Sequence, residues 1–191
     1  ALDADDRENF RFTPQTRSGL PLKEMNDAQR AAAMKLLETA LSDKGRLKAM
    51  QIISLESVLA DIEKRPEYRD SANYFVSIFG KPGDARWGWK FEGHHLALNY
   101  TVAGGGGISV TPSFFGANPA EVQDGEQKGL RVLKAEDELA HTLLRSLLEG
   151  GKTAVIFSEK APAEILTAEK REVTALEPVG VDRNAAVRGG E

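Results

Sequence analysis

Apolar residues recur at helical spacing in two stretches that follow a polar, irregular beginning over residues 1–24. Asn26 suits a helix N-cap, and Gln29 three residues later completes a capping-box pattern. A second helix is predicted to start at Ser42 and to stop before Pro66. The apolar faces are formed by Ala33, Leu36, Leu37, Ala40 and Leu41 in the first helix and by Leu55, Val58, Leu59 and Ile62 in the second. These helices are expected to pack as a hairpin.

From Asn73 onward the pattern changes from helical to alternating. Residues 74–79 are β-branched and aromatic, and turn residues follow them. Two further strands are predicted over residues 87–92 and 96–102, where every second side chain is large. The large side chains are Trp87, Trp89 and Phe91 in the first of these strands and Leu96, Leu98, Tyr100 and Val102 in the second.

These two strands are out of phase with each other. Before Gly93 the large apolar residues have odd numbers, and after it they have even numbers. Side chains alternate strictly along a strand, so one continuous strand would place the two sets on opposite faces. A tight turn or a bulge at residues 92–95 is therefore favoured over a continuous strand.

The remaining pattern completes an α+β prediction. Glycines 104–107 predict another reversal, and residues 108–115 predict a fourth strand that Pro112 confines to an edge. Apolar spacing over 135–149 predicts a helix, whereas 153–157 is too short to separate strand from helix. We expect an N-terminal helical hairpin, an antiparallel meander of about four strands and a further helix. They would form one domain over residues 1–180, with a loose tail over 181–191.

Composition narrows the range of functions. The chain has 191 residues, 25 Lys and Arg against 29 Asp and Glu, and no cysteine. It therefore has no thiolate metal site, cysteine nucleophile or disulfide. The slight acidity and the short apolar runs predict a soluble globular protein, with no nucleic-acid partner and no membrane insertion. A small molecule or a protein partner is compatible with this composition, and so is a homo-oligomer.

The histidines are the strongest candidates for a metal-binding or catalytic role. His94 and His95 are adjacent and follow Glu92 closely, and imidazole with carboxylate is a common ligand set for zinc, copper or iron. Consecutive strand residues point to opposite faces, so the two histidines share an ion only if a turn relaxes that rule. The alternative is that they are polar strand-end residues that bind neighbouring backbone. His141 has the character of an ordinary solvated helix residue.

Most of the bulkiest aromatic residues gather in the predicted sheet. They favour a hydrophobic core, and the alternative is an open aromatic platform for a flat ligand or a sugar. The candidate ligand-binding residues are Trp87, Trp89, Asn99, Asn118 and Arg131.

Two segments, residues 87–100 and 111–122, have the character of family motifs. Together with shorter matches at residues 19–23, 129–133 and 161–166, the chain resembles the domain of unknown function 3500 family over about residues 5–180. The resemblance implies no established activity. It places the histidine pair in the most recognisable motif of the family.

The family resemblance also has implications for a metal site and for the cellular location of the protein. Members continue beyond residue 178 into a further helical segment and a His-x-His region, which implies that a metal site in this chain is incomplete or built with a partner. Phe10-Arg11-Phe12 stands where members tend to have a Trp-His pair. Members often carry export signals, and this chain starts without Met, so a periplasmic or extracellular location is favoured.

Two functional hypotheses follow. In the first, Glu92, His94 and His95 bind a transition metal in an enzyme that acts on a small molecule, with Glu92 as ligand or general base. In the second, the chain is a non-catalytic binding or structural module with an aromatic-rich sheet.

Overall fold

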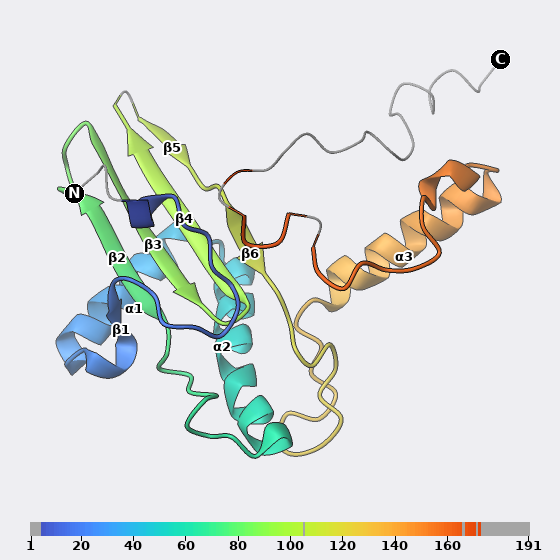
Figure 1. Ribbon diagram of the computed structural model, residues 1–191, viewed down its shortest axis with the longest axis horizontal. Coiled ribbons are helices and arrows are strands. Elements are labelled where there is room, and N and C mark those ends of the chain that lie inside the picture. The colour runs from blue at the N-terminus through green and yellow to red at the C-terminus, as the bar shows by residue number, and fades with distance from the viewer. Residues whose placement is uncertain (1–4, 105, 166, 171, 173–191) are drawn as a thin grey trace. The chain divides into compact units, whose positions relative to one another are not determined.

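The computed structural model describes residues 5–104, 106–165, 167–170 and 172. The chain divides into two compact units, residues 1–133 and 134–191, and each is described by itself. The first unit contains the helices α1 (Asp27–Ala40) and α2 (Asp43–Glu63), the strands β1 (Leu20–Pro21), β2 (Phe75–Gly80), β3 (Arg86–Gly93), β4 (Leu96–Ala103), β5 (Gly107–Ser109) and β6 (Ser113–Phe115), and short 3-10 helices at Asp5–Arg7 and Leu22–Glu24 (Figure 1). The α+β prediction is confirmed.

Both helical N-termini form as the sequence predicts. The Asn26 side chain accepts a hydrogen bond from the Gln29 backbone, and the Gln29 side chain accepts one from the Asn26 backbone. Ser42 caps α2 by accepting a hydrogen bond from the backbone of Gly45. These side chains satisfy amides that have no partner within the helix.

The predicted antiparallel meander is present, with two additions. The strand order is β1-β2-β3-β4-β5, all neighbours are antiparallel, and β6 also pairs with β4. The predicted fourth strand over 108–115 is therefore two short strands on one edge of β4. The two-residue strand β1, which the sequence did not indicate, lies on the opposite edge of the sheet.

A two-residue turn resolves the phase change between β3 and β4. Gly93 pairs with Leu96, so His94 and His95 form the loop. Trp89 then lies opposite Tyr100, and their rings stack at a centroid distance of 4.2 Å. Directly opposite residues of an antiparallel pair share a face, so the odd and even sets meet on one side. The predicted tight turn is confirmed.

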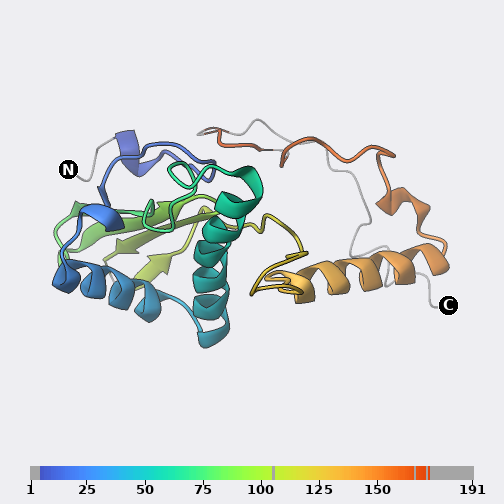
Figure 2. The same cartoon turned by 90° about the horizontal axis from the view of Figure 1, so that it is seen from below.

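The two faces of the sheet have different coverings. The helical side forms the core, which includes Leu37, Ile52, Leu55, Phe91, Leu98 and Tyr100. The other side carries Lys90 and Glu92 and is covered by the N-terminal segment (Figure 2). There Phe12 stacks on Phe114 at a centroid distance of 4.1 Å.

The apolar stripe predicted for α2 is only partly buried. Leu55 and Leu59 are in the core, but Ile62 is 62% exposed. The helix ends at Glu63, where Lys64 adopts the left-handed conformation with φ 57°. Ile62 therefore lies in the last turn of the helix, beyond the part that packs on the sheet.

The second unit contains α3 (Lys134–Glu149) and a 3-10 helix at Thr153–Val155. The predicted helix over 135–149 is confirmed, but Leu139 and Leu143 of its apolar stripe are 69% and 60% exposed. The segment 153–157 contains no strand. The predicted tail at 181–191 lies outside the described residues. Among the described helices, none has the length and apolarity to cross a membrane.

Gly93 is required by the packing of Tyr74. A Cβ at position 93 would overlap the Tyr74 ring, which is fully buried, whereas a Cβ at Gly107 in β5 would meet no atom within 4 Å. We therefore expect Gly93→Ala to lower the free energy of unfolding by about 1–3 kcal/mol, the usual cost of overpacking a core. Urea denaturation would measure it, with Gly107→Ala as the control expected to change by less than about 0.5 kcal/mol. Equal effects of the two substitutions would contradict this account.

Candidate active site

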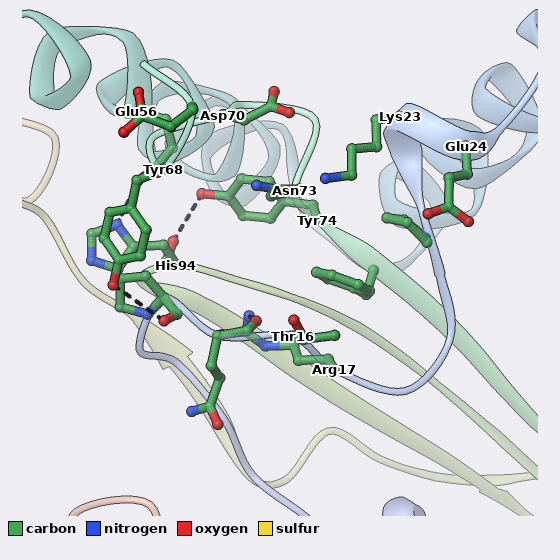
Figure 3. A pocket seen from close by; sticks show the side chains of 15 residues that line it. Thr16, Arg17, Lys23, Glu24, Glu56, Tyr68, Asp70, Asn73, Tyr74 and His94 are labelled. Carbon is green, nitrogen blue, oxygen red and sulfur yellow. Dashed lines mark hydrogen bonds and ion pairs between the residues drawn. The ribbon is translucent and has the colours of Figure 1, made fainter. Parts of the chain in front are cut away.

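A pocket of about 400 Å³ opens beside the histidine turn. Its walls come from four parts of the chain that are distant in the sequence, namely residues 14–24 of the N-terminal segment, Glu56 of α2, residues 67–75 up to the start of β2, and His94 of the turn. Figure 3 shows His94 and Glu56 at one end of the pocket, with Arg17, Lys23 and Asn73 along its sides. The pocket therefore brings charged and polar side chains around one buried imidazole.

Glu56 and His94 form a buried hydrogen-bonded pair. Their exposed fractions are 4% and 7%, and Nδ1 of His94 contacts Oε1 of Glu56. An ionised carboxylate only accepts hydrogen bonds, whereas the Arg69 guanidinium, which also lies near Nδ1, only donates them, so the contact with Glu56 requires the proton on Nδ1 and the contact with Arg69 requires a bare Nδ1. In the arrangement that pairs Nδ1 with Glu56, a neutral ring carries its lone pair on Nε2.

The local structure fixes both members of the pair. Glu56 lies on the buried face of α2 with Ile52, Leu55 and Leu59, so its carboxylate is directed toward the sheet. The backbone carbonyl of His94 accepts a hydrogen bond of 2.8 Å from the buried Tyr74 hydroxyl. Burial raises the pKa of Tyr74, so this hydroxyl remains a donor.

Arg69 supplies positive charge to the pair. Its guanidinium binds Glu63 through two hydrogen bonds, of 2.9 Å from Nε and 2.7 Å from Nη2, and Nη1 lies 3.2 Å from Nδ1 of His94. The hydrogen bond with Glu63 raises the pKa of Arg69 and lowers the pKa of Glu63. Arg69 is therefore a cation held in place by Glu63, and Glu56 is close enough to raise the Arg69 pKa further.

His95 lies next to His94 and does not point to the opposite side. The two ring centroids are 4.0 Å apart with a tilt of 38°. His95 adopts a positive φ of 58°, and its backbone N–H donates to the carbonyl of Phe12 at 2.8 Å. Burial lowers the pKa of His95 to about 4, and the nearby His94 ring and the Arg69 guanidinium lower it further. Its ring is therefore neutral at neutral pH.

Glu92 lies apart from the two histidines. It forms an ion pair with Lys90 at 3.3 Å beside a separate cavity of about 200 Å³, under the N-terminal segment. Lys90 also donates to the backbone carbonyls of Asp6, at 2.8 Å, and Asn9. Burial raises the pKa of Glu92 and lowers that of Lys90, while each partner opposes the shift of the other. Within the described part of the chain, no three His, Asp or Glu side chains are arranged to hold a metal ion.

The five ligand-binding candidates lie outside the pocket that contains His94. Trp89 is buried in the core, and Trp87 packs against it. Asn99 is buried and donates to the carbonyl of Pro112 at 2.8 Å. Asn118 is exposed and Arg131 is half-buried, both in the connection between β6 and α3.

The chain matches a known protein family. A family model described as Protein of unknown function (DUF3500) matches residues 1–185. The chain belongs to the DUF3500 family. No curated protein and no solved structure matches it.

The two motifs that carry the DUF3500 resemblance meet at the histidine turn. The first, residues 87–100, forms β3, the turn and β4, and the second, residues 111–122, begins with β6. The backbone N–H of Gly116 donates to the carbonyl of His95 at 2.7 Å, and the Phe114 ring lies 6.3 Å from the His95 ring between centroids. The second motif therefore supports the geometry of the first.

The histidines of this site are evident in the sequence, but the partners of His94 are not. Glu56, Arg69 and Tyr74 lie on other elements, 20–38 positions earlier in the chain. One signal was available for Glu56, since a carboxylate among Ile52, Leu55 and Leu59 occupies a core position of the helix. A buried charge of this kind needs a partner.

The pKa of His95 predicts a pH dependence of stability. Because folding lowers this pKa from 6.5 to about 4, neutral His95 contributes stability that is complete above about pH 6.5 and is lost as pH falls toward 4. His95→Asn removes the titrating ring and tolerates the positive φ. We expect the wild type to lose about 2 kcal/mol relative to this variant between about pH 7 and 4, allowing for partial exposure. Denaturation at a series of pH values measures it, and parallel curves would refute the assignment.

Proposed function

We propose that this chain carries an enzyme site in which His94 is the general base that acts on a small polar molecule. The observation that carries the proposal is the buried hydrogen bond between Glu56 and Nδ1 of His94 at the wall of the pocket. A carboxylate on one ring nitrogen fixes the tautomer and orients the other nitrogen for proton transfer. Glu56 therefore serves as a positioning residue.

The chemistry follows from this arrangement. Nε2 of His94 accepts a proton from a water molecule or from a substrate hydroxyl, and the resulting imidazolium is stabilised by the carboxylate of Glu56. Tyr74 holds the turn through the His94 carbonyl, so the ring stays in position during the transfer. The expected reactions are hydrolysis or proton abstraction.

The size and lining of the pocket at His94 favour a small and polar substrate. The volume of about 400 Å³ lies within the range of about 300–1,000 Å³ that is usual for ligand pockets. The walls combine the apolar Tyr74 and Phe75 with polar groups, among them Asn73 and Lys23. Such a mixture binds a compact molecule that has several hydrogen-bonding groups.

The tautomer of His94 tests the proposal without a known substrate. Nitrogen-15 NMR of the wild type should show the hydrogen on Nδ1 and a bare Nε2, and Glu56→Leu should remove this preference. His141 is the internal control, because it is exposed on α3 beside Asp137. A hydrogen on Nε2 of His94 in the wild type would support the non-catalytic alternative, in which the histidines only bind neighbouring groups.

A panel of small esters and amides provides the activity measurement. Once a hydrolysed member is found, His94→Gln should lower kcat by about 10²–10⁴-fold, the usual contribution of a general base. Glu56→Gln should have a smaller effect, and His141→Gln none. Unchanged kcat in His94→Gln would exclude the proposed role.

A transition-metal site is the second candidate, favoured by the proximity of the His94 and His95 rings. Neutral imidazoles bind zinc, copper or iron, and a carboxylate on Nδ1 of His94 leaves Nε2 for the ion. Glu92 does not fit as a third ligand, since it is paired with Lys90 in the other cavity. Further ligands would have to come from outside the described residues.

Elemental analysis separates the two candidates. If the metal candidate is right, protein purified without an affinity tag should contain near-stoichiometric zinc, copper or iron, and the double variant His94→Ala/His95→Ala should lose it. Glu92→Gln should keep the metal, because Glu92 does not reach the histidines. A folded wild type without metal would exclude the metal candidate.

A further inference from the structure

A second cleft, of about 570 Å³, lies between the last turns of α2 and the loop over residues 119–127. It shares no lining residue with the pocket at His94. Its volume is also in the usual range for ligand sites. The proposed function does not use this cleft.

The cleft has apolar side chains at its centre. Val58 is half-buried and presents apolar surface to the cleft, whereas Val122 is 1% exposed and anchors the loop in the core. Ile62 is 62% exposed beside them. An exposed isoleucine next to a half-buried valine in a concave surface gives an incoming apolar side chain a contact on two sides.

The rim of the cleft is strongly acidic. Asp61, Glu121, Asp124 and Glu126 line it, against the single cation Lys64. Among the described residues, Asp61, Glu121 and Glu126 form no ion pair that would neutralise them. An uncompensated rim of one sign attracts an opposite charge and rejects a like charge.

The loop that forms the acidic wall is held in place before any partner binds. Val122 and Gly129 are joined by a backbone hydrogen bond of 2.8 Å, and Val122 also donates to Leu130 at 3.0 Å. The Ser54 hydroxyl of α2 lies 3.1 Å from the side-chain oxygen of Gln127. Binding therefore requires little ordering of the loop, which favours affinity.

We propose that this cleft binds a short basic segment of a partner protein. One apolar side chain of the segment contacts Ile62 and Val58, and flanking lysines or arginines face the carboxylates. A second copy of this chain suits the cleft less well, because the exposed leucines of α3 follow Glu136 and Asp137 in its first turn, and these bring charge of the same sign.

NMR titration of nitrogen-15-labelled protein with the peptide KKLKK tests the proposal. Shift changes should concentrate at residues 58–64 and 119–127. KKSKK, which lacks the apolar side chain, and EELEE, which reverses the charge, should each bind at least about tenfold more weakly. Raising the salt from about 50 mM to about 300 mM should weaken binding of KKLKK, because screening reduces the attraction.

Matched variants test the apolar centre and the acidic rim of the cleft separately. Ile62→Ser should weaken KKLKK about fivefold or more, and its fold should survive because the side chain is exposed. Asp61→Lys/Glu126→Lys should weaken it by at least about tenfold. Asp84→Lys changes an exposed turn residue outside the cleft and should have less than about a twofold effect.

The outcomes are decisive in either direction. The expected pattern, with loss in both cleft variants and none in Asp84→Lys, supports the proposal. No saturable binding of KKLKK, shift changes elsewhere, equal binding of KKSKK, or an equal effect of Asp84→Lys would each overturn it. Binding of EELEE in preference to KKLKK would point to a different partner class and would equally overturn it.

Discussion

The register of the β3–β4 hairpin is the constraint on which the rest of the first unit depends. Because Gly93 pairs with Leu96, every odd residue of β3 shares a face with an even residue of β4. A shift of one residue would place Trp89 and Phe91 on the side of the N-terminal segment, and Lys90 and Glu92 among the helices. The two-residue turn therefore determines both the core and the position of His94.

Much of this architecture was predictable because it rests on local chemistry. The caps at Asn26 and Ser42 and the change of phase at Gly93 are each readable within a few residues. The short strand β1 was not predictable, since it contains Pro21 and exists only through pairing with β2, more than 50 residues later. The fourth predicted strand is divided because the chain leaves the ladder between Ser109 and Ser113.

The site was harder to predict than the fold, because its members come from separate elements. Adjacent histidines next to a glycine drew attention to the turn, but the carboxylate that contacts His94 is Glu56 rather than Glu92. Spacing along one strand suggested Glu92, whereas His94 has already left the strand and lies in the loop. The nearest residue in sequence was therefore not the partner in space, and only the packing of α2 on the sheet shows the pairing.

The packing of Tyr74 against Gly93 has a consequence for how this sequence can diverge. One side chain both fills the space above position 93 and donates to the His94 carbonyl. A relative with a larger residue at position 93 must therefore have a smaller one at position 74, and it would lose the hydroxyl that holds the turn. Two simultaneous changes, and a new anchor for the carbonyl, separate such a sequence from this one, so positions 74 and 93 are expected to covary as a pair.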